Sequence, residues 1–194
     1  MDARQRRSQL RLHAAVLRLA EETPVAEVSV TAVAGAAGVH RSTFYEHAAS
    51  PGDLLRAALT AELDEARARL LADPDADVVT AMEQTTVAVA DHLRRHAAIY
   101  RRGLAPDAGP GSLVTMLAEH FQRSGRLLVE QGRVHLLVTA TATAQEVTVE
   151  AGLGFIAFGT VGAARAWLAQ PEPRDPAEFL ALVEALQPDW WGRR

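Results

Sequence analysis

The sequence predicts an all-α protein with an N-terminal three-helix domain and a larger helical domain at residues 50–194. Ala, Leu, Arg and Glu are strong helix formers, and they are frequent in a chain of 194 residues that is 48% hydrophobic and 23% charged. Apolar residues recur three and four positions apart, which is the spacing of amphipathic helices. Ser-Pro and Asp-Pro pairs mark several helix starts. We expect the first domain to span residues 1–49.

The composition excludes several classes of protein. The chain has no cysteine, which rules out disulfides, thiolate metal sites and cysteine nucleophiles. Its first residues carry charges throughout and lack the apolar core of a signal peptide. The uncharged run Ala151–Ala164 is predicted to be too short to cross a bilayer, so we expect a cytoplasmic protein with no membrane partner. The net charge is −4, and the basic residues that stand out are Arg4, Arg6, Arg7 and Arg11.

The first two helices are predicted from their apolar spacing and their ends. A helix from about Ala3 to Glu22 ends before Pro24. Its apolar positions are Leu10, Ala14, Val16, Leu17 and Ala20. Ser29 can cap a second helix at Val30–Ala37, because its hydroxyl can accept a bond from a free backbone N–H. The residues expected to face the core are Val33, Ala34 and Ala37.

A third short helix is predicted at His40–His47. Ala34, Gly38 and Phe44 have the spacing of a helix-turn-helix: the small Ala lets two helices approach, and Gly adopts the turn conformation. Phe44 then anchors the second helix to the core. The side chains left outside are donors and an aromatic ring, which suit phosphates and base edges. They are His40, Arg41, Ser42, Thr43, Tyr45 and His47.

Ser50-Pro51-Gly52-Asp53 is predicted to start a fourth helix that runs to about Leu71. Pro51 costs nothing at the first helical position, because its missing N–H would have no partner there. Ser50 is the expected cap, and the Asp53 carboxylate would return a bond to the backbone amide of Ser50. The apolar stripe of this helix is Leu54, Leu55, Ala58, Leu59, Leu63 and Leu70.

The rest of the chain is predicted as helices with one ambiguous segment. Asp73-Pro74 and Asp175-Pro176 are expected to open helices, the first of which reaches about His96. Between them we expect helices at Ala97–Leu104 and Leu113–Gln131, a loop at 105–112, and a helix at Gln145–Ala169 that is buried on most sides. Residues 134–143 are rich in β-branched side chains, but an isolated strand would lack a partner, so a loop or distorted helix is predicted there.

The segment from residue 29 to residue 55 matches the motif of a known family. The matching residues are Ser29, Val33, Ala34, Ala37, Gly38, Val39, Ser42, Thr43, Phe44, Tyr45, His47, Leu54 and Leu55. In these positions the chain resembles the DNA-binding domain of the TetR (tetracycline repressor) family of bacterial transcriptional regulators. The remainder agrees only in length, helical content and the Trp167-Leu168 ending of its penultimate helix.

The resemblance implies a homodimeric, ligand-responsive repressor that binds a pseudo-palindromic operator, the double-stranded DNA partner. In that family a small-molecule effector binds a helix-lined pocket in the C-terminal domain. The last two long helices of each subunit form a four-helix dimer interface. Ligand binding moves the fourth helix and releases DNA. The resemblance also implies that the chain is not an enzyme and needs no cofactor.

Two positions depart from the family pattern. Ala48 stands where the family commonly has Phe, which is expected to weaken local packing. Pro51 stands where the family commonly has Lys, which removes a phosphate contact and should flatten the salt dependence of DNA binding by about 0.9 in slope. A phosphate at this place would meet the backbone amide of Gly52 or Asp53 at the helix N-terminus.

Three groups of candidate site residues follow. For DNA binding they are Ser29, Thr31, His40, Arg41, Ser42, Thr43, Tyr45, His47, Arg4, Arg6 and Arg7. For an apolar ligand pocket with a few polar points they are Met82, Thr86, Val89, His92, Tyr100, Met116, His120, Phe121 and Phe155. For the dimer interface they are Phe155, Phe158, Gly159, Gly162, Ala166, Phe179, Val183 and Leu186. Solvated helix ends and ordinary core packing remain the alternatives for each group.

Two other functions stay open at this point. His92 and His96 lie four residues apart on one helix, and with Glu119 they could serve a metal-dependent hydrolase. The segment HLRRH lacks the Glu of a zinc protease, however, and its two Arg side chains would repel a cation, so no metal site is predicted. Ala48 and Pro51 leave open a helical scaffold that has lost DNA binding.

Overall fold

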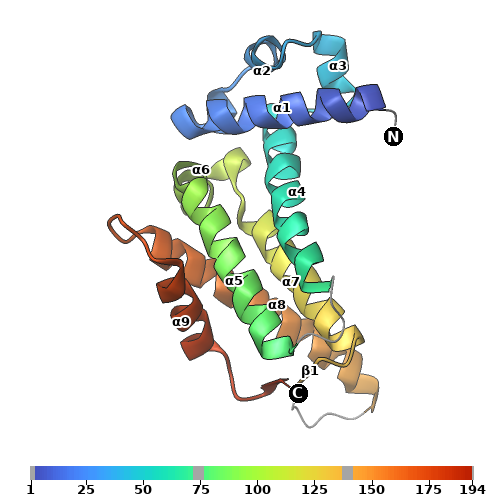
Figure 1. Cartoon of the computed structure of the whole chain (residues 1–194), viewed down its shortest axis with the longest axis vertical. Helices are drawn as coiled ribbons and strands as arrows, with labels where there is room; N and C mark the ends of the chain where they lie inside the picture. The colour runs from blue at the N-terminus through green and yellow to red at the C-terminus, as the bar shows by residue number, and fades with distance from the viewer. Residues whose placement is uncertain (1–2, 72–76, 137–141, 194) are drawn as a thin grey trace. The chain divides into compact units, whose positions relative to one another are not determined.

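The computed structural model describes residues 3–71, 77–136 and 142–193, and most of these residues lie in helices (Figure 1). The α-helices are α1 (Ala3–Glu22), α2 (Val30–Ala37), α3 (Arg41–Tyr45), α4 (Pro51–Leu71), α5 (Val78–Arg95), α6 (Ala97–Gly103), α7 (Val114–Glu130), α8 (Ala142–Leu168) and α9 (Pro176–Leu186). The 3-10 turns η1 (Val25–Glu27) and η2 (Gly109–Gly111) and the short strands β1 (Val134–Leu136) and β2 (Trp191–Arg193) complete the elements of these residues. The predicted all-α class is confirmed.

The chain divides into two compact units. The first unit is Met1–Glu62 with His96–Leu113, and the second is Leu63–Arg95 with Val114–Arg194. The first unit extends past residue 49, where the sequence places a domain boundary, because α6 packs against α1 and η2 packs against η1. The first three helices are therefore supported by elements from later in the chain.

The first unit is built on one face of α1. Its buried residues are Leu12, Ala15, Val16 and Ala20. Leu10 is 63% exposed and Ala14 is also exposed, so the predicted face was wrong at these two positions. Apolar spacing fixes the period of a helix, but α2 and α6 determine which side of α1 is covered.

The ends of α2 and α3 agree with the sequence pattern. The Ser29 hydroxyl accepts a hydrogen bond from the backbone N–H of Ala32 at 3.1 Å. Gly38 ends α2 in the left-handed conformation, with φ 60° and ψ 45°, which only glycine adopts without strain. Phe44 is fully buried. The predicted third helix, His40–His47, is shorter in the structure, because His40 and Glu46 are its caps.

Ser50 and Asp53 cap the start of α4, as the sequence predicts. The Ser50 hydroxyl accepts a bond from the Asp53 N–H at 3.1 Å, and it donates to Asp53 Oδ2 at 2.6 Å. The other carboxylate oxygen, Oδ1, accepts a bond from Arg56 at 2.6 Å. A hydrogen bond from the Ser50 backbone N–H also contributes to the lowered pKa of the Asp53 carboxyl, in agreement with the predicted capping box.

The second unit is a helical bundle in which α7 packs along α8, and α9 lies against α5 and α8 (Figure 1). One of its core clusters contains Val78, Ala81, Leu128, Val134, Leu153 and Trp191. Gly125 lies where α7 approaches α8, and a Cβ there would lie 2.8 Å from Leu153 Cδ2. A larger residue at 125 would require the Leu153 side chain to move.

The ambiguous segment contains a strand. β1 pairs antiparallel with β2, with Val134 opposite Arg193 and Leu136 opposite Trp191. The expectation of a loop or distorted helix was wrong at residues 134–136, because the partner strand comes from the C-terminal end of the chain. Residues 137–141 of the segment lie outside the described residues, and α8 begins at Ala142.

The two Asp-Pro helix starts have different outcomes. At α9 the prediction is confirmed: Asp175 Oδ1 accepts a bond from the Ala177 N–H at 2.9 Å, and Pro176 takes the first helical position. Asp73-Pro74 lies outside the described residues. Within them α5 begins at Val78, where Asp77 Oδ2 accepts a bond from the Thr80 N–H at 2.8 Å.

Helix α8 is more exposed than predicted. The apolar stretch Val147–Leu168 contains an 18-residue window with a mean hydropathy of 1.5, and 28% of that window is buried. Val147 is 70%, Phe155 65% and Phe158 58% exposed. This stretch is longer than the uncharged run Ala151–Ala164, which the sequence analysis judged too short to cross a bilayer. Its length therefore does not exclude a membrane span. Core helices of water-soluble proteins meet the same criterion.

Candidate functional site

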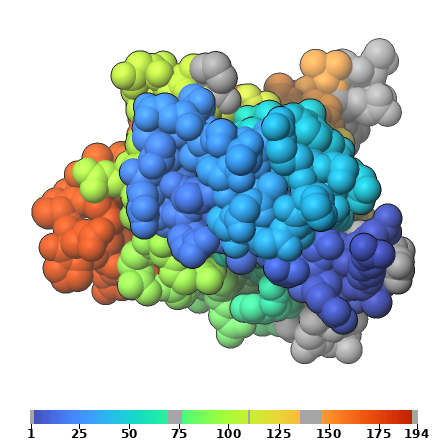
Figure 2. All heavy atoms as spheres, turned by 90° about the horizontal axis from the view of Figure 1, so that it is seen from above, coloured from blue at the N-terminus to red at the C-terminus, as the bar shows by residue number. Residues whose placement is uncertain are grey.

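The outer face of α3 presents polar side chains to solvent in the first unit. His40, Arg41 and Ser42 are exposed. Tyr45 is 54% exposed, and its ring meets the buried ring of Phe44 edge-on at 5.5 Å. Figure 2 looks onto the face of the unit that α1 to α3 build. A helix held from below by Phe44 with donors on its outer side can enter a major groove.

Thr43 and His47 are less available than the sequence suggests. Both are half-buried. His47 Nε2 is enclosed and has no hydrogen-bond partner. The pKa of the neighbouring His13 is lowered by its burial and then by the charge of His47. His47 is therefore partly a packing residue between α3 and α1.

Arg11 supports the turn between α2 and α3. Its guanidinium donates a hydrogen bond to the carbonyl oxygen of Gly38 at 3.1 Å. A Cβ at Gly38 would collide with the same guanidinium. The sequence groups Arg11 with the N-terminal cations, and its role in the turn could be found only from the fold, because the two residues are 27 positions apart.

The remaining candidates for DNA contact lie near the ends of α1 and α2. Arg4, Arg6 and Arg7 are exposed on the first turns of α1. Thr31 is exposed on the first turn of α2. Ser29 is exposed as well, but its hydroxyl oxygen already accepts the capping bond.

The start of α4 carries a cation that the sequence analysis did not single out. Arg56 lies one turn after Pro51, and its guanidinium forms an ion pair with Asp53 at 2.6 Å. Hydrogen bonds from Ser50 and then Arg56 lower the pKa of the Asp53 carboxyl. The i, i+3 spacing of Asp53 and Arg56 was a visible signal for this pair. The carboxylate offsets the positive charge at the helix start.

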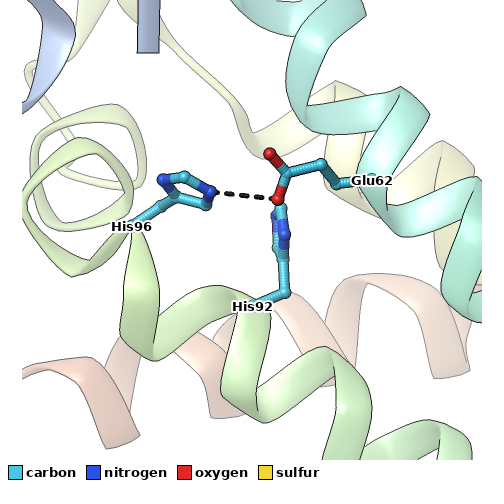
Figure 3. Close-up of side chains that lie close together, drawn as sticks. All are labelled: Glu62, His92 and His96. Atoms are coloured by element: carbon cyan, nitrogen blue, oxygen red, sulfur yellow. Dashed lines mark hydrogen bonds and ion pairs between the residues drawn. The ribbon is translucent and has the colours of Figure 1, made fainter. Parts of the chain in front are cut away.

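A cluster of polar groups joins α1 to α6 in the first unit. His96 Nδ1 lies 3.1 Å from a Glu21 oxygen, and Nε2 lies 3.1 Å from a Glu62 oxygen (Figure 3). Arg102 donates to the carbonyl oxygens of Ala20 and Glu21, which are free at the end of α1. Both ring nitrogens of His96 thus face carboxylates, and a metal ligand role for His96 would have to break one of these contacts.

The second unit contains a cavity of about 140 Å³ between α5, α7, α8 and α9. Its lining is mostly apolar, and it is formed by Met82, Thr85, Thr86, Val89, His120, Phe121, Ser124, Gly125, Leu128, Phe155, Ile156, Gly159, Thr160, Ala163, Val183, Leu186, Gln187 and Trp191. Six of the nine pocket residues expected from the sequence are among them: Met82, Thr86, Val89, His120, Phe121 and Phe155. This is the composition of a small-molecule site.

The other three expected pocket residues lie elsewhere. His92 and Met116 are buried in α5 and α7 of the second unit, away from the cavity lining. Tyr100 is fully buried in the first unit, where desolvation and then the Glu62 carboxylate raise the pKa of its hydroxyl. Figure 3 labels His92, which belongs to the second unit, whereas Glu62 and His96 belong to the first. Glu119, proposed with it for a metal site, is exposed on α7.

His120 is the buried titratable side chain in the cavity wall. It is 1% exposed, and burial lowers its pKa to about 4, with a further contribution from Arg67. Asp64 opposes this shift, since its Oδ1 lies 3.7 Å from His120 Nδ1. Arg67 is itself 2.8 Å from the same oxygen and offsets that charge. The imidazole is therefore neutral at neutral pH.

The expected dimer residues fall into an exposed group and a buried one. Phe155, Phe158, Gly159, Gly162 and Ala166 are exposed on α8, and Leu186 is 59% exposed on α9. A Cβ at Gly159 or Gly162 would meet no atom within 4 Å. Val183 is half-buried. Phe179 was misplaced in this group, because it is fully buried with its ring 5.4 Å from that of Trp167.

Comparison with known proteins identifies the fold. No protein-family model and no curated protein matches the chain. Solved structures do. The TetR-family repressor FadR of Thermus thermophilus, crystallised with lauroyl-CoA, has a TM-score of 0.59 and 23% identity over 92% of this chain and 92% of its own. A TetR regulator from Streptococcus agalactiae has a TM-score of 0.62 and 17% identity, with 96% and 97% covered. The dihydroxyacetone kinase operon activator DhaS has a TM-score of 0.63 and 10% identity, with 92% and 93% covered.

The chain thus has the all-α fold of the TetR-type transcriptional regulators. The matches span nearly the whole of both chains, so the likeness includes the C-terminal helices as well as the helix-turn-helix. The structural neighbours are proteins that control transcription.

Proposed function

We propose that this protein is a TetR-family transcriptional repressor that works in the cytoplasm. It binds a pseudo-palindromic operator as a homodimer through α3, and a small molecule releases it. The observation that carries the proposal is the geometry of α2, the Gly38 turn and α3. The turn is fixed by a left-handed glycine and by Arg11, while His40, Arg41, Ser42 and Tyr45 remain open to solvent.

The exposed face of α8 supports the homodimer. An apolar helix with Phe155 and Phe158 more than half exposed is costly in water, and a second copy of the same helix can cover it. A Cβ added at Gly159 or Gly162 would meet no atom of another described element within 4 Å, which leaves room for a close approach by another backbone.

The cavity of the second unit supports a small-molecule effector. It is the largely apolar, concave kind of site in which proteins hold such ligands. FadR of Thermus thermophilus holds lauroyl-CoA. The described lining of this cavity contains no Arg that would bind the phosphates of a CoA ester, so we do not extend that ligand to this chain.

The test is DNA selection with the purified full-length protein. A random-sequence duplex pool should yield an enriched inverted repeat, and Arg41→Ala should weaken binding to it by about 1–3 kcal/mol while relaxing the preference at one base of each half-site. Arg123→Ala, on the exposed side of α7, is the matched control and should leave binding unchanged. Failure to enrich any motif would support the scaffold that has lost DNA binding.

A further inference from the structure

We infer that the effector of this cavity is an uncharged, mainly apolar compound with a hydroxyl group, of which a neutral phenol is the simplest kind. The inference rests on the proposed function only in calling this ligand an effector. The cavity chemistry stands on the lining residues themselves, which come from α5, α7, α8, α9 and β2.

The hydroxyl groups of the lining are hydrogen-bond acceptors toward a ligand. Thr85 donates its hydroxyl hydrogen to the carbonyl oxygen of Ala81 at 2.8 Å, and Thr86 donates to Met82 at 2.8 Å. Ser124 donates to His120 at 2.9 Å, and Thr160 donates to Ile156 at 2.8 Å. A hydroxyl has one hydrogen and two lone pairs, so each oxygen keeps the capacity to accept. Three helices thus offer acceptors and favour a ligand that donates.

Two buried nitrogen atoms of the lining, Trp191 Nε1 and His120 Nδ1, have no hydrogen-bond partner among the described residues. The indole N–H can only donate, whereas a neutral imidazole nitrogen donates or accepts according to its tautomer. A ligand hydroxyl can donate to Thr or Ser and accept from an indole N–H at once, whereas an ether or a ketone can only accept. A hydroxyl group matches this mixture of hydroxyl acceptors and two unsatisfied ring nitrogens.

The charge balance of the lining excludes ionic ligands. Within the described residues the lining has no Asp, Glu, Lys or Arg, and His120 is neutral at neutral pH because burial lowers its pKa to about 4. A carboxylate or an ammonium group would therefore lose its hydration without an opposite charge to replace it. The aromatic rings of Phe121, Phe155 and Trp191 favour an aromatic body for the ligand.

Isothermal titration calorimetry of the full-length protein without DNA tests the inference. It uses three probes that share a naphthalene ring and differ only in the group at position 2. They are 2-naphthol, 2-methoxynaphthalene and 2-naphthoate at pH 7. We expect 2-naphthol to bind, the methyl ether to bind about tenfold more weakly, and the anion to bind at least about a hundredfold more weakly. Equal binding of the ether, stronger binding of the naphthoate, or no binding of 2-naphthol would each overturn the inference.

The variant Thr160→Val provides a second readout, because valine keeps the shape of threonine and removes the acceptor. It should weaken 2-naphthol and leave 2-methoxynaphthalene unchanged. Loss of both ligands to the same extent would mean that the hydroxyl acts through packing and not as an acceptor. DNA selection is independent of these titrations: an absent operator would refute the regulator while leaving the ligand chemistry intact, and the reverse outcome would refute the ligand chemistry alone.

Discussion

The buried side chain of His120 makes the stability of the second unit depend on pH. Its pKa is about 4 in the folded protein against 6.5 in a model peptide, because burial disfavours the charged ring. Between these two values the unfolded chain binds more protons than the folded one, so protonation favours unfolding. The folded state therefore keeps its full stability above about pH 6.5, where His120 is neutral in both states. This stability is lost as the pH falls from 6.5 toward 4.

We therefore expect the second unit to lose about 3 kcal/mol of stability between pH 7 and pH 4 through this residue. All three tryptophans of the chain lie in that unit, so urea unfolding followed by tryptophan fluorescence reports on it. His120→Gln should give a flatter pH profile than the wild type, and His40→Gln, at an exposed site, should not. Identical profiles for His120→Gln and the wild type would show that His120 does not titrate in this range.

At the level of elements, the start of α4 bears on the proposed contact with the DNA backbone. Pro51 supplies no charge, and the nearby Arg56 is paired with Asp53 at 2.6 Å. The sequence-based expectation of a phosphate on the backbone amides of Gly52 or Asp53 has an added cost, because Ser50 already bonds to the Asp53 N–H. The helix start thus has a weaker attraction for phosphate than one that carries a lysine.

Pro51→Lys should strengthen binding to any duplex and steepen the plot of log affinity against log salt by about 0.9. Pro51→Gln is the control, since it removes the same ring without adding charge and should leave the slope unchanged. Fluorescence anisotropy with specific and random duplexes at several salt concentrations measures both quantities. If the lysine variant kept the wild-type slope, the start of α4 would not approach the phosphates.

At the level of the whole molecule, the exposed side of α8 is the proposed dimer interface. Phe158→Glu places a charge among Phe155, Gly159 and Gly162, and it should convert a dimer into monomers at micromolar concentration. Analytical ultracentrifugation measures the change. Leu10→Glu is the control, because Leu10 is just as exposed but lies on α1 of the other unit. A monomeric wild type, or a Phe158→Glu variant that stays dimeric, would refute the α8 interface.

Much of the helix-turn-helix region was predictable from short-range patterns. The Ser29 cap, the Gly38 turn and the inward position of Phe44 each depend on a few neighbouring residues, and the structure agrees with all three. The candidate contacts on α3 follow from the same pattern, apart from the partial burial of His47. The capping of α4 by Ser50 and Asp53 was predicted as well, whereas the additional bond from Arg56 to Asp53 was not.

The sequence by itself determined the helical class, the helix ends and the chemistry of α3, since capping, glycine turns and propensity act within a few residues. Only the tertiary structure decided which helices, strands and side chains pack against one another. The tertiary structure determines which face of α1 is buried, and it buries Phe179. It pairs β1 with β2, which lie far apart in the sequence. It also brings His120, Thr86 and Phe155 together around one cavity. These outcomes depend on elements that are far apart in the chain, and no local pattern specifies which elements meet.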